Sequence, residues 1–447
     1  MTQRLPFDMP SLEAPAFPDS LFDIRDYGAV ADGLTASTQA FVRAIEACHN
    51  AGGGVVSIPA GTWLTGPIHL RSNVNLRLEQ GALLRFSTRP ADYLPPVFTR
   101  WEGVECYNYS PLIYAHDCES IAVTGAGVLD GQGQAWWHWK KLQHAAAKTL
   151  YDAQLEGVPV ERRVYGTEEA ALRPQFLQPM RCQNVLVEGV TFLNGPMWTM
   201  HPVYCENVLV RGVTVNTEGP NTDGLNPDSC RNVLIEGCSF ATGDDCIAIN
   251  SGMNEDGWRV GWPCENVVIR NCTMSEGHGA VAIGSGMSGG VRHVHISDCR
   301  FTGGDQGIRL KSMRGRGGVV EDVYVDNILM AGLRQEAIVL DMFYGFSTAP
   351  SRSDAPPAFR SIHIKNVTCS GAGVAVAIRG LPEQPIERLV LENLHLNAVE
   401  GIHCQDADDL TLRDVTCIAQ HEPLFSCSNV RGLNVVDMKL EQTYPVQ

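Results

Sequence analysis

Residues Cys182–Phe192 read CQNVLVEGVTF, Cys205–Val215 read CENVLVRGVTV, and Cys230–Phe240 read CRNVLIEGCSF. A fourth copy, Cys264–Met274, reads CENVVIRNCTM. In each copy apolar residues alternate with polar ones, stop at a two-residue corner, and then resume the alternation. This is the periodicity of a β-strand interrupted by a bend. Each copy is therefore predicted to form two short strands rather than a helix.

Weaker copies extend the repeat in both directions. They begin at Cys118, Val291, Val320, Phe359, Ile386, Ala407 and Val430. From Cys182 onward, successive copies start about 21 to 39 residues apart, which lies in the range of solenoid repeats. A propeller blade would need four antiparallel strands and roughly 40 or more residues. The spacing therefore favours a solenoid.

A further apolar run follows several copies. These runs are Asp245–Ile249, Gly279–Ile283, Gly307–Lys311 and Glu336–Leu340. Three strands per turn, each pairing with its counterpart one turn later, build a parallel β-helix with Val, Ile, Cys and Phe stacked inside. The fold class predicted from the residues is all-β, with a parallel β-helix architecture.

The N-terminal part of the chain is predicted to cap this solenoid. Residues 38–50 place Phe41, Ile45 and Cys48 on one face of a helix, and the glycines at 52–54 end it. A cap of this kind covers the open apolar end. Because the repeat runs from about 118 to 442 without a linker, residues 1–447 are predicted to form one domain. Its N-terminal cap region is about 1–60, and an insertion at about 136–172 lies near the groove.

The composition of the chain argues against some binding partners and some cellular locations. The formal net charge of −16 argues against nucleic acid, because phosphate binding requires a basic surface. A polyanionic sugar would need a local basic patch, which His278, Arg309, Lys311, Arg314 and Arg316 could supply. No apolar run is long enough to span a membrane, and the first residues lack the pattern of a signal peptide. We therefore expect a cytoplasmic protein with no membrane partner.

The fifteen cysteines are interpreted as core residues. Many stand at repeated positions of the copies, where a reduced thiol packs as a small apolar group. No CxxC pair suggests zinc. The sequence predicts no metal and no cofactor.

Four polar signatures stand on successive turns. They are Asn221–Gly224 (NTDG), Gly243–Asp245 (GDD), Gly277–Gly279 (GHG) and Arg309–Lys311 (RLK). Adjacent turns lie about 4.8 Å apart, so four turns span roughly 15 Å. Glycoside hydrolysis needs one carboxylic acid to protonate the leaving oxygen and a carboxylate to activate water or attack. Aspartates this close raise each other's pKa, so one of them could keep the proton that a general acid needs. The Arg and Lys of the last signature could bind a carboxylate of the substrate.

Each signature by itself has a structural interpretation. NTDG and GDD are good turn sequences, glycines permit tight corners, and a single histidine is more often a surface residue. The catalytic interpretation depends on the four signatures occurring together and in order. An aromatic run, Trp136, Trp137 and Trp139, is interpreted either as a sugar platform or as a packed cover for the insertion.

The ordered set NTDG, GDDC, GHG and RLK resembles the family 28 glycoside hydrolases, the polygalacturonases and their relatives. The resemblance covers nearly the whole chain, from Phe22–Gly28 (FDIRDYG) through Asp130–Gly133 (DGQG) to the last turns. It implies a single-stranded, right-handed, pectin-lyase-like β-helix. It also implies a pectic, galacturonate-containing oligosaccharide as substrate.

The resemblance implies an inverting single displacement with assigned catalytic roles. Asp244 would be the general acid, and Asp223 with Asp245 would activate the water. His278 would sustain the protonation and orientation of the acid.

The resemblance also implies substrate-binding residues. Arg309 and Lys311 would grip the galacturonate carboxylate on the leaving side, and Asn221 and Tyr344 would contact substrate. Three segments are similar to the bacterial exo-acting branch of the family. They are Arg173–Phe176 (RPQF), Ser251–Gly257 and Ser285–Gly290.

The chain departs from that branch where the non-reducing terminal sugar would bind. Asn250, Trp258 and Gly286 stand where lysine, arginine and glutamate are expected. Fewer cations imply a neutral or modified terminal sugar, such as rhamnose, as an alternative to galacturonate.

Two rival functions remain open at this stage. A pectate lyase would share the scaffold but eliminate with a basic residue, usually with calcium held by acidic side chains. A non-catalytic carbohydrate-binding β-helix would bind without turnover.

Overall fold

The computed structural model describes residues 5–345 and 355–443. The chain divides into two compact units: an N-terminal unit, Pro10–Asp244, and a C-terminal unit, Asp245–Gln447 together with Met1–Met9. Each unit is described by itself. Within the described ranges, no helix combines the length and apolar character needed to cross a membrane. The prediction of a single domain stays a prediction.

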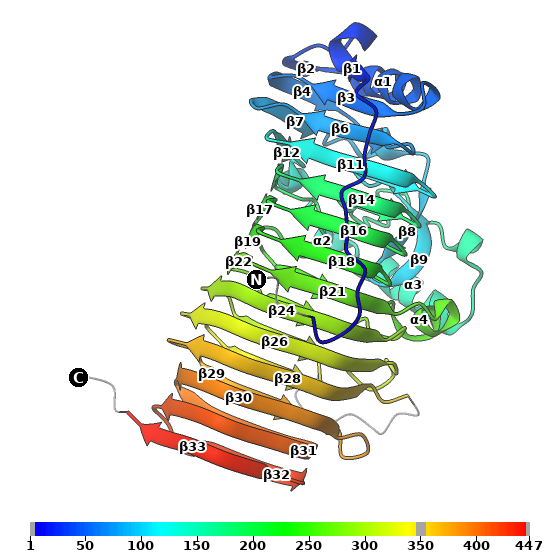
Figure 1. The fold of residues 1–447 in the computed structure, drawn as a ribbon. Coiled ribbons are helices and arrows are strands. Elements are labelled where there is room, and N and C mark those ends of the chain that lie inside the picture. Colours follow the sequence, from blue (N-terminus) through cyan, green and yellow to red (C-terminus); the bar gives the residue numbers. More distant parts are fainter. Residues whose placement is uncertain (1–4, 346–354, 444–447) are drawn as a thin grey trace. The chain divides into compact units, whose positions relative to one another are not determined.

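The N-terminal unit is a right-handed parallel β-helix made of three ladders (Figure 1). The first ladder contains β1 (Leu21–Asp23), β3 (Gly54–Ile58), β6 (Val74–Leu78), β11 (Glu119–Gly125), β14 (Gln183–Glu188), β16 (Glu206–Arg211) and β18 (Arg231–Glu236). The second contains β2 (Asp32–Ala36), β4 (Gly61–Thr65), β7 (Ala82–Phe86), β12 (Val128–Asp130), β15 (Thr191–Leu193), β17 (Thr214–Asn216) and β19 (Ser239–Ala241). The third contains β5 (Ile68–His69), β10 (Ile113–His116) and β13 (Leu177–Met180), and isolated bridges through Met200 and Leu225 extend it.

The repeat pattern sets the register of these ladders. Val185 pairs with Val208, and Val208 pairs with Val233 one turn later. All three side chains are buried. The alternating apolar positions therefore form the stacked core, as predicted.

Not all outward positions are polar. Leu186 and Leu209 point away from that core yet are buried with Ala122, because Phe17 of the N-terminal segment packs against them. This N-terminal segment runs along the outside of the strands in Figure 1. The outward leucines are thus explained by a cover far away in sequence.

The asparagine of each copy bends the chain near the beginning of the first strand of that copy. Asn184, Asn207 and Asn232 have φ between 56° and 58°, a left-handed conformation that asparagine tolerates better than most residues. Their amides also form a ladder: Asn207 Nδ2 donates to Asn184 Oδ1 at 3.0 Å, and Asn232 Nδ2 donates to Asn207 Oδ1 at 3.1 Å. The repeated asparagine therefore supports both the corner and the stacking.

The N-terminal cap is confirmed. Helix α1 (Thr38–Asn50) buries Phe41, Ile45 and Cys48 and packs against β1 and β3. The unit also contains the 3-10 helices η1 (Ile24–Tyr27), η2 (Pro90–Tyr93), η3 (Gly133–Ala135) and η4 (Val160–Arg162).

Two insertions interrupt the repeat of the N-terminal unit. The first is an antiparallel hairpin of β8 (Val97–Trp101) and β9 (Val104–Asn108). The second carries helices α2 (Trp139–Leu142) and α3 (His144–Leu155), inside the segment 136–172 that breaks the periodicity. Both bring side chains to the turns that hold the candidate site.

The C-terminal unit is also built from parallel ladders. One ladder contains β21 (Cys264–Arg270), β22 (Thr273–Ser275), β24 (Val291–Thr302), β26 (Val319–Ala331), β28 (Ala358–Cys369), β30 (Ile386–Ala398), the end of β31 (Glu400–Ala419) and β33 (Asn434–Gln442). The other contains β20 (Ile247–Ile249), β23 (Gly279–Ile283), β25 (Gln306–Lys311), β27 (Glu336–Asp341), β29 (Val374–Arg379), the start of β31 and β32 (Phe425–Arg431). Helix α4 (Asn254–Val260) lies between β20 and β21 in sequence.

The copies of the C-terminal unit differ from the predicted pair of short strands. From β24 onward each copy is one strand that passes through the corner, as in the 12 residues of β24. Asp298 takes the left-handed conformation there, with a φ of 54°, so the strand bends without breaking its pairing. The fold class itself, a right-handed parallel β-helix, is confirmed.

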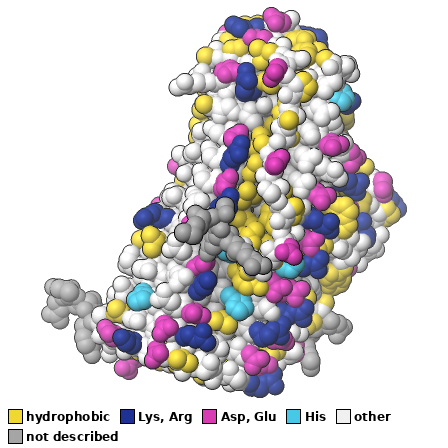
Figure 2. Space-filling model, in the orientation of Figure 1, with side chains coloured by type: hydrophobic (Ala, Val, Ile, Leu, Met, Phe, Trp, Pro, Cys, Tyr) yellow, Lys and Arg dark blue, Asp and Glu magenta, His cyan; other side chains and the backbone are white. Residues whose placement is uncertain are grey.

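The cysteines pack as core residues in the described parts of both units, where none of the fifteen forms a disulfide. All are buried except Cys427. Acidic and basic side chains are interspersed over the face shown in Figure 2.

Candidate active site

The predicted residues divide between the two units. Asn221, Asp223 and Asp244 belong to the N-terminal unit, and Asp245 begins the C-terminal unit. His278, Arg309, Lys311 and Tyr344 also belong to the C-terminal unit. Asp244 and Asp245 are joined by a peptide bond.

Asp223 follows β17 in a tightly bonded turn. The Thr222 hydroxyl donates to the carbonyl of Gly219 at 2.6 Å, which closes the turn. The Asp223 side chain is buried, and its Oδ2 accepts a hydrogen bond from Asn226 Nδ2 at 2.9 Å. A hydrogen bond from an amide favours the acceptor role of this carboxylate.

Asp244 follows β19 and is half-buried. Its backbone carbonyl accepts from the Thr242 hydroxyl at 2.7 Å, and its Oδ2 accepts from Asn221 Nδ2 at 3.3 Å. Asn221 in turn accepts from the guanidinium of Arg173 at 2.8 Å. Asn221 therefore contacts the predicted acid directly.

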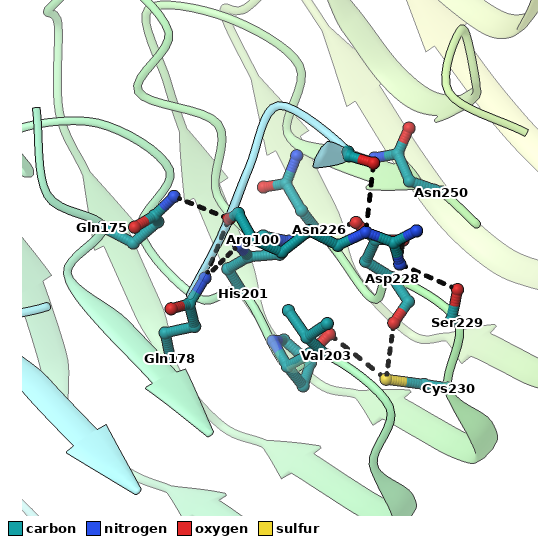
Figure 3. Close-up of polar contacts among 12 residues, drawn as sticks. Arg100, Gln175, Gln178, His201, Val203, Asn226, Asp228, Ser229, Cys230 and Asn250 are labelled. Atoms are coloured by element: carbon teal, nitrogen blue, oxygen red, sulfur yellow. Dashed lines mark hydrogen bonds and ion pairs between the residues drawn. The ribbon is translucent and has the colours of Figure 1, made fainter. Parts of the chain in front are cut away.

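A buried polar network holds the segment that follows Asp223 (Figure 3). Arg100, from strand β8, pairs with Asp228 at 2.9 Å, and both side chains are 0% exposed. Asp228 also lies 3.4 Å from His201 Nε2, and the Gln178 amide donates to His201 Nδ1 at 2.9 Å if that nitrogen is unprotonated. Burial lowers the pKa of His201, although the neighbouring Asp228 opposes this shift. The sequence did not predict this network.

Glu102 is a second residue that the sequence did not predict. It lies at the turn between β8 and β9 and is half-buried. Loss of solvation raises its pKa; Lys140 and Arg173 act against this shift, and Asp244 adds to it. The hairpin thus brings a fourth carboxyl group into the electrostatic environment of Asp244. No motif marks it, because the hairpin lies outside the repeat.

In the C-terminal unit, Asp245 is held between two cations. Arg309 Nη1 lies 3.0 Å from its Oδ1, and Lys311 Nζ lies 2.6 Å from its Oδ2. Gly279 makes room for this arrangement, since a Cβ there would lie 2.7 Å from Asp245 Oδ1 and 3.2 Å from Arg309 Cδ. One glycine of the GHG signature is therefore required by packing at the site.

Tyr344 lies beside both cations, and His278 directly precedes Gly279 in the same unit. The Tyr344 ring lies 5.1 Å from Lys311 Nζ and 5.6 Å from the Arg309 guanidinium carbon, within the range of cation–π contacts. His278 is exposed at the start of β23, and its carbonyl accepts from the amide of Gln306. Gly277 precedes it with a φ of 99°, a conformation that favours glycine.

Of the three positions that depart from the exo-acting pattern, Asn250 and Gly286 are neighbours, whereas Trp258 has other contacts. A Cβ on Gly286 would lie 3.6 Å from the buried Asn250 Oδ1, so these two positions are neighbours. Trp258 is 41% exposed and donates from Nε1 to the carbonyl of Arg316 at 3.0 Å. The Trp258 indole lies against Gly317, and the described contacts of Gly286 do not include it.

Two of the five cations expected in a basic patch are engaged in packing. Arg314 bonds to both oxygens of Glu383, at 2.5 and 3.0 Å. Arg316 donates to Asn254 Oδ1 at 2.7 Å. Both side chains are buried, so the expectation that they supply a surface patch is corrected.

The tryptophan run of the insertion is packed for the most part, and its role as a sugar platform stays a prediction. Trp136 and Trp139 are buried against each other and form a packed cover. Trp137 is half-buried, donates from Nε1 to Gly195 O at 2.9 Å, and lies against Gly219. It adjoins the turn that leads to Asn221.

Comparison with known proteins identifies the family of this chain. The model for glycosyl hydrolases family 28 matches residues 162–411. A probable polygalacturonase from Vitis vinifera is 33% identical over 388 residues, which cover 83% of this chain and 74% of the relative. An exo-poly-alpha-D-galacturonosidase from Dickeya chrysanthemi is 27% identical over 436 residues, covering 89% and 70%. The structure of a hyperthermoactive exopolygalacturonase from Thermotoga maritima matches with a TM-score of 0.84 and 36% identity, covering 96% of this chain and 94% of that one. The chain belongs to glycosyl hydrolase family 28.

Proposed function

We propose that this protein is a pectin-degrading hydrolase that removes sugars from the ends of galacturonate-containing oligosaccharides with inversion. Membership of family 28 supports the substrate class, because the similar proteins from Vitis vinifera, Dickeya chrysanthemi and Thermotoga maritima are named as enzymes acting on polygalacturonate. The observation that carries the catalytic assignment is the different environment of two consecutive aspartates. Asp245 bonds to Arg309 and Lys311, whereas Asp244 bonds to the neutral amide of Asn221.

These environments suit different roles in one displacement. Ion pairs with Arg309 and Lys311 hold both oxygens of Asp245 in place, which suits a carboxylate that orients water. Asp244 accepts a hydrogen bond from the neutral amide of Asn221, and we assign to it the proton for the leaving oxygen. Asp223, which accepts from Asn226, would share the activation of water with Asp245. His278 would then help to orient the acid.

The substrate carboxylate on the leaving side is assigned to Arg309 and Lys311. Arg309 is partly exposed, and its planar guanidinium can bind a carboxylate through two donors. Tyr344, which packs beside both cations, is assigned to contact the same sugar. Substrate binding would therefore share these cations with Asp245.

The exo mode is supported by the two insertions. The hairpin turn at Glu102 and the helical segment around Gln143 and Trp137 both lie beside the turns of Asn221 and Asp244. We propose that they close one end of the groove, so that only chain ends enter. An open groove would release internal fragments instead.

A neutral terminal sugar is the second candidate for the cleaved end. The observation that favours it is the neighbouring pair Asn250 and Gly286, which places an amide and no side chain where a charged pair is expected. Replacing Asn250 by Lys should raise kcat/KM for a galacturonate-terminated substrate about tenfold relative to a rhamnose-terminated one, the value of one charge-assisted hydrogen bond. Asn250→Gln is the neutral control and should leave the ratio unchanged. Equal ratios in both variants would remove the assignment of Asn250 to the terminal sugar.

The main experiment compares wild type and Asp244→Asn on defined pectic oligosaccharides, with the products followed by proton NMR. Loss of the acid should lower kcat about 10²–10⁴-fold with the fold intact. The first anomer released reports inversion, and the product sizes report exo or endo action. Full activity in Asp244→Asn would contradict the assignment.

Two observations separate the rival functions. A lyase product absorbs in the ultraviolet and its formation stops in chelator, because calcium is usually required. Asp245, with cations on both of its oxygens, is a poor calcium ligand in the arrangement described. A non-catalytic binding protein would bind oligosaccharides and leave them intact in both wild type and Asp244→Asn.

A further inference from the structure

We propose that Arg173 is a positioning residue that acts through Asn221 to orient the carboxyl group of Asp244, and that Gln143 ties this chain of contacts to the helical insertion. The inference rests on the proposed function, since it takes Asp244 as the general acid. All four residues belong to the N-terminal unit.

Arg173 joins two consecutive turns of the β-helix. Its side chain is 0% exposed. Nη1 donates to the carbonyl of Pro220 at 2.6 Å and to that of Pro196 at 3.1 Å. Pro196 lies after β15, and Pro220 lies after β17, one turn later. A rigid planar cation therefore sets the position of the turn from which Asn221 projects.

The same guanidinium decides how the Asn221 amide faces. Arg173 Nη2 donates to Asn221 at 2.8 Å, and only Oδ1 of an amide can accept. Nδ2 must then point the other way, where Asp244 Oδ2 lies 3.3 Å from it. If the cation were absent, the amide could rotate and present its oxygen to Asp244. Arg173 thus makes Asn221 a donor toward the acid.

This orientation selects the oxygen of Asp244 that carries the proton. The carbonyl oxygen of a carboxylic acid is a better acceptor than its hydroxyl oxygen, so the hydrogen bond from Asn221 to Oδ2 favours the proton on Oδ1 in the reactant state. In the reaction, that proton moves to the glycosidic oxygen, and the bond from the anomeric carbon to that oxygen breaks with its electron pair staying on the oxygen. Water supplies the hydroxyl group to the anomeric carbon and its proton to a base. Asp244 becomes a carboxylate, so the hydrogen bond from Asn221 becomes charge-assisted and stronger as the proton leaves.

The helical insertion holds the other end of the guanidinium. Arg173 Nε donates to Gln143 Oε1 at 3.1 Å, and Gln143 is buried between α2 and α3. Burial lowers the pKa of Arg173 to about 10, against the opposing charges of Glu102, Asp223 and Asp244. The side chain is still a cation at neutral pH. The helical insertion is therefore connected to Asp244 through the hydrogen bonds of Gln143, Arg173 and Asn221.

The test compares two substrates that differ in their need for protonation. The leaving group of a pectic disaccharide is a sugar, which would depart as an unstable alkoxide without a proton from the acid. The leaving group of a dinitrophenyl glycoside of the same terminal sugar is a stable phenolate, which departs without protonation. Arg173→Lys keeps the charge but loses the planar set of donors. It should lower kcat on the disaccharide about 10- to 100-fold, within the range of acid catalysis, and change kcat on the aryl glycoside less than about threefold. KM should be unchanged.

Asn221→Ala and Gln143→Leu test the same contacts if Arg173→Lys does not fold. Asn221→Ala should show the same selective loss, and Gln143→Leu a smaller loss in the same direction. Arg100→Lys is the matched control, because this buried arginine of the same unit bonds to Asp228 rather than to Asn221. It should affect both substrates equally.

The outcomes separate this inference from the proposed function. Asp244→Asn should lose activity mainly on the disaccharide. If it does, but the Arg173, Asn221 and Gln143 variants lose activity equally on both substrates, Arg173 is only structural and the inference fails. If Asp244→Asn itself shows no selectivity, the assignment of the acid fails first.

Discussion

Lys311 donates from Nζ to Asp245 Oδ2 at 2.6 Å, and the two side chains are only 10% and 1% exposed. The cation assigned to the substrate carboxylate is therefore also the partner of a carboxylate assigned to water activation. The two proposed roles would then be coupled through one ion pair. Binding and chemistry should then respond together when either residue is changed.

Replacing Lys311 by Met should lower kcat and raise KM. The reason is that Asp245 loses a neutralising partner and the substrate carboxylate loses a cation. In a double-mutant cycle with Asp245→Asn, the effects on kcat/KM should be non-additive by about 1–3 kcal/mol. Lys439→Met, at an exposed position of β33, is the control and should behave as wild type. Additive losses would show that the pair is not coupled in catalysis.

Replacing Arg100 by Met should destabilise the protein by about 3–5 kcal/mol, because it leaves the buried Asp228 without its cation. The free energy of unfolding in urea measures this. Arg89→Met is the matched control, since Arg89 pairs with Asp92 at an exposed position and should cost less than about 1 kcal/mol. A similar cost for both variants would mean that the buried network contributes little.

Stability should fall as the pH drops below about 6.5, the ordinary pKa of histidine. Burial lowers the pKa of His201 in the folded state, so above 6.5 the ring is neutral in both states and its contribution is complete. Below 6.5 the unfolded chain binds a proton that the folded protein does not, and stability is lost until the folded pKa is reached. Thermal midpoints at pH 7.5 and 5.5 should therefore differ less in His201→Gln than in wild type. A variant at the exposed His138 should follow the wild type.

Replacing Gly219 by Ala should destabilise the turn before Asn221. The new Cβ would lie 2.1 Å from Cε2 and Nε1 of Trp137, so the indole must move. We expect a cost of about 1–3 kcal/mol, typical of overpacking, and a lower kcat. Adding Trp137→Ala should recover part of the stability. Gly371→Ala is the control, because its Cβ would meet only ordinary contacts, and a thermal midpoint as low as that of Gly219→Ala would contradict the steric explanation.

Periodicity allowed the scaffold to be predicted in detail. The alternation around Val185 and Val208 gives the stacked core, and Phe41 with Ile45 gives the capping helix. It also allowed the catalytic candidates to be placed on successive turns, because equivalent positions of a repeat must lie in the same ladder. Even so, the sequence left the environment of Arg314 open, and the structure buries this side chain. A charged residue in a loop has no period, and nothing in the sequence indicates its pairing with Glu383, 69 residues away.

The residues that support Asp223 and Asp244 in the N-terminal unit illustrate the same limit. Arg100 is paired with Asp228 across 128 positions, and Arg173 meets Asn221 across 48. Both come from segments outside the repeat, whose partners depend on how an irregular chain packs.

The sequence by itself determined the parallel β-helix and the cap, because a repeat converts spacing along the chain into position in space. It also proposed the aspartates, cations and histidine of the site. Only the tertiary structure decided that Lys311 and Arg309 bond to Asp245, that Gly279 leaves room for them, and that Arg173 turns Asn221 toward Asp244. Those outcomes depend on side-chain packing and on the burial of charge, which no local pattern encodes.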